Sequence, residues 1–117
     1  MLVVDDDADT AMTFAALIES MQHHAAYVTR SVEALGVARA FRPEIAFLDL
    51  GMPKLDGYAL AQMFRAAPEL NAVALVAVSG HDQPKDRERS RQAGFDAHVG
   101  KPLDAQLLEA ILIQFGS

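Results

Sequence analysis

Residues 45–49 read Ile-Ala-Phe-Leu-Asp, four apolar residues in succession that stop at an acid. Consecutive apolar side chains are typical of a strand that is buried on both faces, as in a parallel sheet covered by helices. Similar short apolar runs occur four more times along the chain. They are Leu2–Val4, Ala25–Val28, Ala74–Val78 and Ala97–Val99. The sequence therefore predicts five strands in one parallel sheet.

The segments between and after these runs carry apolar residues at helical spacing. In the first segment they recur every three or four residues, which indicates one buried face of a helix. They are Ala11, Phe14, Ala15, Ile18 and Met21. Helices are expected likewise over residues 32–41, 58–67, 84–93 and 104–115, with Ser31 capping the second helix. Alternating strands and helices with short connections predict an α/β doubly wound fold.

The composition limits the classes of protein to which the chain can belong. Its 117 residues, 51% of them hydrophobic, suit a single domain over residues 1–117. With 16 acidic and 10 basic residues the net charge is −6, which argues against direct nucleic-acid binding. The absence of cysteine excludes disulfides and zinc–thiolate sites. No apolar run reaches the roughly 18 residues of a membrane span, so we expect a cytoplasmic protein without membrane insertion.

Polar side chains follow four of the five predicted strands at the point where each strand ends. Asp5-Asp6-Asp7 follows the first strand, Asp49 the third, Ser79 the fourth and Lys101 the fifth. In open α/β sheets the ligand crevice lies at the carboxyl ends of the strands. We therefore expect these groups to meet at one edge of the sheet.

The chemistry of this set of side chains favours a metal ion and phosphoryl transfer. Several carboxylates in one crevice stay ionised together only beside a cation, or else one of them takes up a proton. Oxygen ligands without His or Cys suit Mg²⁺ or Mn²⁺. A carboxylate nucleophile, a divalent ion, a lysine and a hydroxyl are the groups that phosphoryl transfer to an aspartate needs. Asp49 is the candidate nucleophile.

Four short motifs resemble those of two-component response-regulator receiver domains, the CheY-like superfamily. They are Val3-Val4-Asp5-Asp6, the stretch Phe47-Leu48-Asp49-Leu50-Gly51-Met52-Pro53 with Leu55-Asp56-Gly57, Ser79-Gly80 and Gly100-Lys101-Pro102. Their order and spacing match the family, and the resemblance covers essentially the whole chain. It implies a flavodoxin-like sheet of five parallel strands in the order 2-1-3-4-5 with five helices.

The resemblance also implies a role for each site residue. Asp49 is the phosphoacceptor. Asp6 and Asp49 bind Mg²⁺ directly with the backbone carbonyl of Gly51, and Asp5 holds a metal-bound water. Ser79 donates to the phosphoryl group and Lys101 forms an ion pair with it. The protein is then a signalling switch rather than an enzyme acting on other substrates.

The expected partners follow from the same resemblance. The phosphodonor is a phosphohistidine of a sensor histidine kinase or a histidine phosphotransfer domain. The output passes to a further domain or a downstream protein. The Leu-Gly-Met-Pro stretch at residues 50–53 resembles receivers attached to hybrid histidine kinases.

Three further positions are those at which receivers vary. Receivers often carry Tyr or Phe three residues before the lysine as a switch residue that moves with Ser79, and here that residue is His98. An imidazole is smaller and changes charge near neutral pH. Gly51 and His81 stand at the positions that in the family influence how long the phosphoryl group lasts.

Other interpretations of the same residues remain open at this point. Asp7 and Asp9 suit the first turn of a helix, where the helix dipole favours acids. Asp56 and Asp104 are expected to be N-caps.

Two other functions are compatible with part of the pattern. An aspartate-nucleophile phosphatase carries Asp-x-Asp-x-Thr/Val after its first strand, but here the last place holds Asp9 or, in the later register, Ala11. A receiver-shaped interaction module without phosphorylation would be expected to lack one of Asp6, Asp49 and Lys101, and all three are present.

Overall fold

The computed structural model describes residues 1–52, 55–80, 84–101 and 104–115, and its centre is a five-stranded parallel sheet. The strand order is β2-β1-β3-β4-β5, as predicted, and every strand pair is parallel. The strands are β1 (Leu2–Val4), β2 (Ala26–Val28), β3 (Ile45–Asp49), β4 (Ala74–Ser79) and β5 (Ala97–Gly100).

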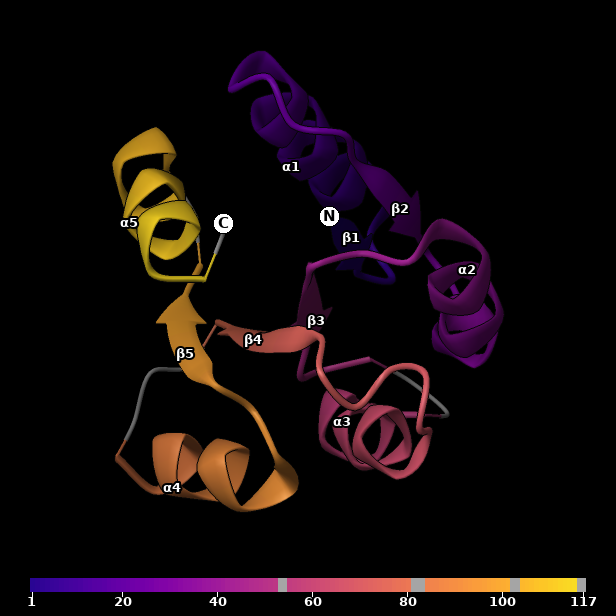
Figure 1. Ribbon diagram of the computed structural model, residues 1–117. Coiled ribbons are helices and arrows are strands. Elements are labelled where there is room, and N and C mark those ends of the chain that lie inside the picture. The colour runs from indigo at the N-terminus through magenta and orange to yellow at the C-terminus, as the bar shows by residue number, and fades with distance from the viewer. Residues whose placement is uncertain (53–54, 81–83, 102–103, 116–117) are drawn as a thin grey trace.

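Helices cover both faces of this sheet (Figure 1). They are α1 (Ala8–Ser20), α2 (Ala34–Phe41), α3 (Gly57–Ala66), α4 (Pro84–Ala93) and α5 (Ala105–Phe115), with a short 3₁₀ turn, η1 (Ser31–Glu33), before α2. Helices α1 and α5 lie on one face, and α2, α3 and α4 lie on the other. The fold is therefore the α/β doubly wound arrangement that the strand pattern predicted, in the flavodoxin-like form that the resemblance implied.

Alternate residues of the central strands supply two hydrophobic cores. Val3 and Phe47 pack with α1 and α5, whereas Leu2, Val4 and Leu48 pack with α2 and α3. All residues of β1 and β3 are buried. This double burial explains why the sequence shows unbroken apolar runs in place of alternation.

The N-caps expected at Asp56 and Asp104 are confirmed, and Asp7, expected only as an acid in the first turn of a helix, is also an N-cap. Asp7 accepts hydrogen bonds from the backbone N–H groups of Asp9 and Thr10 at the start of α1. Asp56 accepts from Ala59 N–H at the start of α3. Asp104 accepts from Leu107 N–H at the start of α5, at 2.7 Å. These acids satisfy helix N–H groups that have no partner within the helix.

The cap expected at Ser31 is wrong. Ser31 is buried and is the first residue of η1, and α2 begins only at Ala34, preceded by Glu33 without a side-chain cap bond. Because the chain turns through the 3₁₀ segment first, the α-helix starts too far along the chain for the Ser31 hydroxyl to cap it.

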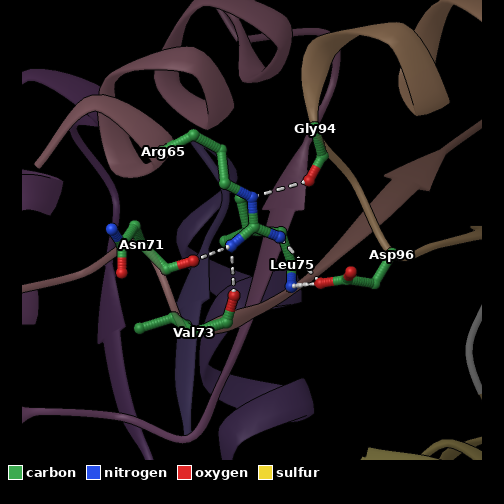
Figure 2. Close-up of polar contacts among 6 residues, drawn as sticks. All are labelled: Arg65, Asn71, Val73, Leu75, Gly94 and Asp96. Atoms are coloured by element: carbon green, nitrogen blue, oxygen red, sulfur yellow. Dashed lines mark hydrogen bonds and ion pairs between the residues drawn. The ribbon is translucent and has the colours of Figure 1, made fainter. Parts of the chain in front are cut away.

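A polar cluster built around Arg65 of α3 joins the amino ends of β4 and β5. Its guanidinium donates to three backbone carbonyls and to the carboxylate of Asp96, and that carboxylate also accepts from Leu75 N–H (Figure 2). The carbonyls belong to Asn71, Val73 and Gly94. We call these six residues the Arg65 cluster. It fixes α3, β4 and the segment before β5 to one another.

Gly94 ends α4 as expected and is required at this cluster. It has φ of +108°, and the N–H groups of Gly94 and Phe95 donate to Arg91 and Ser90 in a Schellman arrangement. A Cβ atom on Gly94 would lie 2.9 Å from Cγ of Arg65. Any larger residue would therefore strain the turn and displace the arginine.

Candidate functional site

The strand register brings the predicted site residues to the carboxyl edge of the sheet. Val4 lies opposite Leu48, so Asp5 and Asp49 follow neighbouring strands at the same level. Ser79 is paired with Gly100, and Lys101 N–H donates to the Ser79 carbonyl at 2.8 Å. The four strand ends therefore lie at one edge of the sheet, each with a polar residue.

Three carboxylates gather in this crevice. Asp5, Asp6 and Asp49 each offer an oxygen, and these oxygens lie within 4.8 Å of one another. Asp5 and Asp49 are buried, and Asp6 is exposed. The limit of 4.8 Å slightly exceeds the roughly 4.2 Å that two direct ligands at ~2.1 Å from Mg²⁺ can span, so the group suits an ion that one carboxylate reaches through a bound water. The acidic triad therefore fits a hard cation, with water completing the coordination.

Lys101 partly balances these charges. Its Nζ atom lies 3.0 Å from Oδ2 of Asp5 and 3.4 Å from Oδ2 of Asp49. Burial alone would lower the pKa of Lys101, but the hydrogen bond with Asp5 and the charges of Asp49 and Asp5 outweigh burial and raise that pKa. The ammonium group is thus held charged between two carboxylates.

The surroundings of Asp49 disfavour its ionised form. Burial raises the pKa of Asp49, and the charge of Asp5 raises it further. The backbone N–H of Gly51 and the ammonium of Lys101 act in the opposite direction but do not cancel the effect of burial. A cation bound between the carboxylates would favour the ionised form.

Backbone hydrogen bonds orient the two buried carboxylates. Oδ1 of Asp5 accepts from Asp7 N–H at 2.9 Å, and Oδ1 of Asp49 accepts from Gly51 N–H at 3.1 Å. In each residue the other oxygen, Oδ2, faces Lys101. The carboxylates are therefore held in place by their own loops.

The site lies beside a cavity of about 520 Å³ that runs along α1. Its lining includes Asp5, Asp49 and Lys101 together with the apolar residues Phe14 and Phe47. A small ion or phosphoryl donor has space to approach the carboxylates from this side.

Gly57 is a site residue that the sequence reasoning missed. A Cβ atom there would lie 2.6 Å from the backbone oxygen of Asp49 and 3.0 Å from Cα of Leu50. Glycine therefore lets the first turn of α3 contact the end of β3 directly. The signal is the Asp56-Gly57 pair shortly after the acid, which belongs to one of the receiver-like motifs but by itself indicates only a turn and a helix start.

The remaining predicted site residues are Ser79, Gly51, His98 and His81. Ser79 is buried at the end of β4, and Gly51 is exposed beside Asp49. His98 on β5 is half-buried, with its Nδ1 atom 2.9 Å from Oγ of Ser90 on α4. His81 lies outside the described residues.

Comparisons with known proteins agree with this geometry. The model of the response regulator receiver domain family matches residues 1–113. The polar-differentiation response regulator DivK of Brucella anthropi is 27% identical over 99% of this chain and 95% of its own length.

Two solved receiver domains share the fold over nearly their full lengths. A CheY-like response regulator receiver domain from Methylobacillus flagellatus is 34% identical with a TM-score of 0.86, covering 97% of this chain and 95% of its own. The receiver domain of the sensor histidine kinase PA1611 from Pseudomonas aeruginosa is 27% identical with a TM-score of 0.88, covering 99% and 96%. Its structure holds a magnesium ion coordinated in the active-site cleft.

The chain belongs to the response regulator receiver domain family. It is a signalling module of two-component systems rather than an enzyme, and it carries the acidic pocket used in phosphoaspartate signalling. Membership implies a histidine kinase as phosphodonor. Within the described ranges, none of the helices combines the length and apolar character that crossing a membrane requires.

Proposed function

We propose that Asp49 accepts a phosphoryl group from the phosphohistidine of a sensor histidine kinase or a histidine phosphotransfer domain. The observation that carries this proposal is the meeting of three carboxylates within 4.8 Å with an ammonium 3.4 Å from Asp49. Because Oδ2 of Asp49 faces Lys101 and Oδ1 is held by Gly51 N–H, Oδ2 is the oxygen positioned to attack.

The reaction transfers one phosphoryl group without net oxidation. The Asp49 oxygen forms a bond to phosphorus while the phosphorus–nitrogen bond of the donor breaks and neutral imidazole leaves after taking up a proton. Water later attacks phosphorus, releases inorganic phosphate and regenerates the carboxylate.

The acidic residues fit a magnesium site. Asp6 and Asp49 would hold Mg²⁺ with the backbone carbonyl of Gly51, and Asp5 would bind a coordinated water. The ion would neutralise charge on the phosphoryl oxygens. Asp5 suits the indirect role because its carboxylate is already engaged by Lys101 and by Asp7 N–H.

Phosphorylation would act as a switch through the ends of β4 and β5. The modification adds about −1.5 to −2 charge at Asp49. Lys101 and the hydroxyl of Ser79 would turn toward that charge, and His98 on β5 would respond to the movement. Gly51 and His81 would set the lifetime of the phosphoryl group, because Gly51 has no side chain to shield it.

We assign residues 1–117 to one receiver domain acting in the cytoplasm, where histidine kinases use ATP. Its output would pass to a further domain or a protein partner, with no direct nucleic-acid contact. Attachment to a hybrid histidine kinase is favoured by the Leu-Gly-Met-Pro stretch at residues 50–53.

Incubation with acetyl phosphate and Mg²⁺, followed by intact mass analysis, tests the function. The protein should gain one phosphoryl group that requires Mg²⁺ and is removed by hydroxylamine, and Asp49→Asn should abolish the gain. Asp7→Asn is the matched control, since asparagine keeps the N-cap of α1 and the label should persist.

Other outcomes would contradict the proposal. A label that survives Asp49→Asn would place the acceptor elsewhere. Repeated turnover of many phosphoesters that survives the same change would indicate a phosphatase. A failure to label wild type would indicate an interaction module.

A further inference from the structure

A hydrogen bond between two polar side chains links β5 to α4. The Nδ1 atom of His98 lies 2.9 Å from Oγ of Ser90, and Ser90 is only 1% exposed. Buried polar groups need hydrogen-bond partners, because leaving one unsatisfied costs free energy. Imidazole and hydroxyl therefore form a matched pair across the interface, whichever ring tautomer is present.

This pair matters because α4 has little apolar surface to bury. Among the α4 side chains that the structure describes, residues 87–93, only Ser90 and Ala93 are buried. The guanidinium of Arg87 also lies 3.5 Å from the backbone oxygen of His98. Polar contacts to His98 are thus a principal connection between α4 and the strand beside it.

His98 lies between a fixed point and the phosphorylation site. At the amino end of β5, Asp96 N–H donates to the Leu75 carbonyl at 2.7 Å and the Asp96 carboxylate belongs to the Arg65 cluster. At the carboxyl end, Gly100 pairs with Ser79 and Lys101 contacts Asp49. A change at the site would therefore displace the carboxyl half of β5 while its amino end stays anchored.

We propose that Ser90 is a positioning residue that ties His98 to α4, so that phosphorylation of Asp49 is passed through β5 to α4. The inference rests on the proposed function, since it needs a phosphoryl group at Asp49. A hydrogen bond suits this task because it depends on direction: rotation of the imidazole breaks it, whereas a purely apolar contact tolerates a small displacement.

Nuclear magnetic resonance of the full chain, with and without acetyl phosphate and Mg²⁺, tests the coupling. In the unphosphorylated protein, Ser90→Ala should shift the ring nitrogen signals of His98. After phosphorylation, wild type should show shifts in the amides of both Ser79 and residues 87–93. Ser90→Ala should keep its phosphorylation level and the shift at Ser79 but lose most of the α4 response.

Two further variants keep the result decisive. Ser20→Ala is the matched control, since it removes a serine hydroxyl that donates to the Leu17 carbonyl near the end of α1, and it should leave the α4 response intact. If Ser90→Ala loosens α4 before phosphorylation, Ser90→Thr decides, because threonine keeps a hydroxyl. A response restored in Ser90→Thr supports the proposal, and a response lost in both variants overturns it.

The outcomes separate this inference from the proposed function. An α4 response of equal size in wild type and Ser90→Ala overturns the inference alone. A wild type that takes up no phosphoryl group overturns the proposed function and the inference together.

Discussion

At the carboxyl edge of the sheet, three carboxylates gather and two of them, those of Asp5 and Asp49, contact the ammonium of Lys101. At the amino edge, the guanidinium of Arg65 meets one carboxylate and three carbonyls. Both clusters tie neighbouring strands together. The Arg65 cluster matches donors to acceptors, while the acidic cluster holds more negative charge than Lys101 neutralises. The difference indicates that one edge is built for stability and the other to take up a cation and a phosphoryl group.

Removing the guanidinium should cause the largest loss of stability. Arg65→Gln deletes most donors of the Arg65 cluster and leaves partly buried carbonyls without them, so we expect a loss of about 2–4 kcal/mol in the free energy of unfolding. Urea unfolding measures it. Arg39→Gln, which breaks an exposed pair with Glu69, should have a much smaller effect. Equal losses in the two variants would show that the Arg65 cluster stabilises the fold no more than an exposed ion pair does.

A methyl group at Gly57 should damage the acidic edge. Gly57→Ala places Cβ 2.6 Å from the Asp49 backbone oxygen, and relief of that overlap should cost about 1–3 kcal/mol and slow phosphorylation by displacing Asp49. Gly36→Ala in α2 is the matched control, because its Cβ would meet nothing within 4 Å and alanine favours helix. Thermal unfolding and the rate of acetyl phosphate labelling measure both variants. A Gly57→Ala protein as stable and as reactive as wild type would refute the close approach.

Neutralising the acidic edge should stabilise the protein. Since the pKa of Asp49 is raised on folding, the folded state binds a proton more readily than the unfolded state does. The contribution of Asp49 to the free energy of unfolding is therefore fully present below the pKa that Asp49 has in the unfolded chain. It is lost as the pH rises through the higher pKa that Asp49 has in the folded protein. Without Mg²⁺, the melting temperature of Asp49→Asn should therefore exceed that of wild type by a margin that grows with pH. A constant or shrinking margin would contradict this charge balance.

Magnesium should relieve the same repulsion. At ten times the dissociation constant, binding should stabilise wild type by about 1.4 kcal/mol, read as a rise in melting temperature. Asp6→Ala should reduce that rise more than Asp7→Ala, because Asp7 caps α1 and is not a predicted metal ligand. Equal reductions in the two variants would show that the metal ligands are assigned wrongly.

The sequence predicted those features that depend on local pattern. Buried strands produced continuous apolar runs, and the parallel arrangement then placed Asp5, Asp49 and Lys101 at one edge. Helix caps at Asp56 and Asp104, and an acid at the start of α1 at Asp7, followed from the preference of acids for helix starts.

Features that depend on contacts between distant segments were not visible in the pattern. The Arg65 cluster uses backbone carbonyls, which every residue carries, so the sequence gives no sign of which will meet a guanidinium. The Ser90–His98 bond joins a helix to a strand across a turn whose geometry the pattern does not specify. The Ser31 prediction was wrong because a 3₁₀ turn precedes α2, and the close approach at Gly57 became evident only with the backbone in place.

Localisation of the phosphoryl group tests the central claim most directly. Protein labelled with acetyl phosphate and Mg²⁺ is reduced with borohydride, which converts an aspartyl phosphate to homoserine, and the modified residue is found by tandem mass spectrometry. The account predicts homoserine at position 49 alone, formed only when Mg²⁺ is present during labelling. Homoserine at position 5 or 6, or labelling that needs no divalent ion, would contradict it.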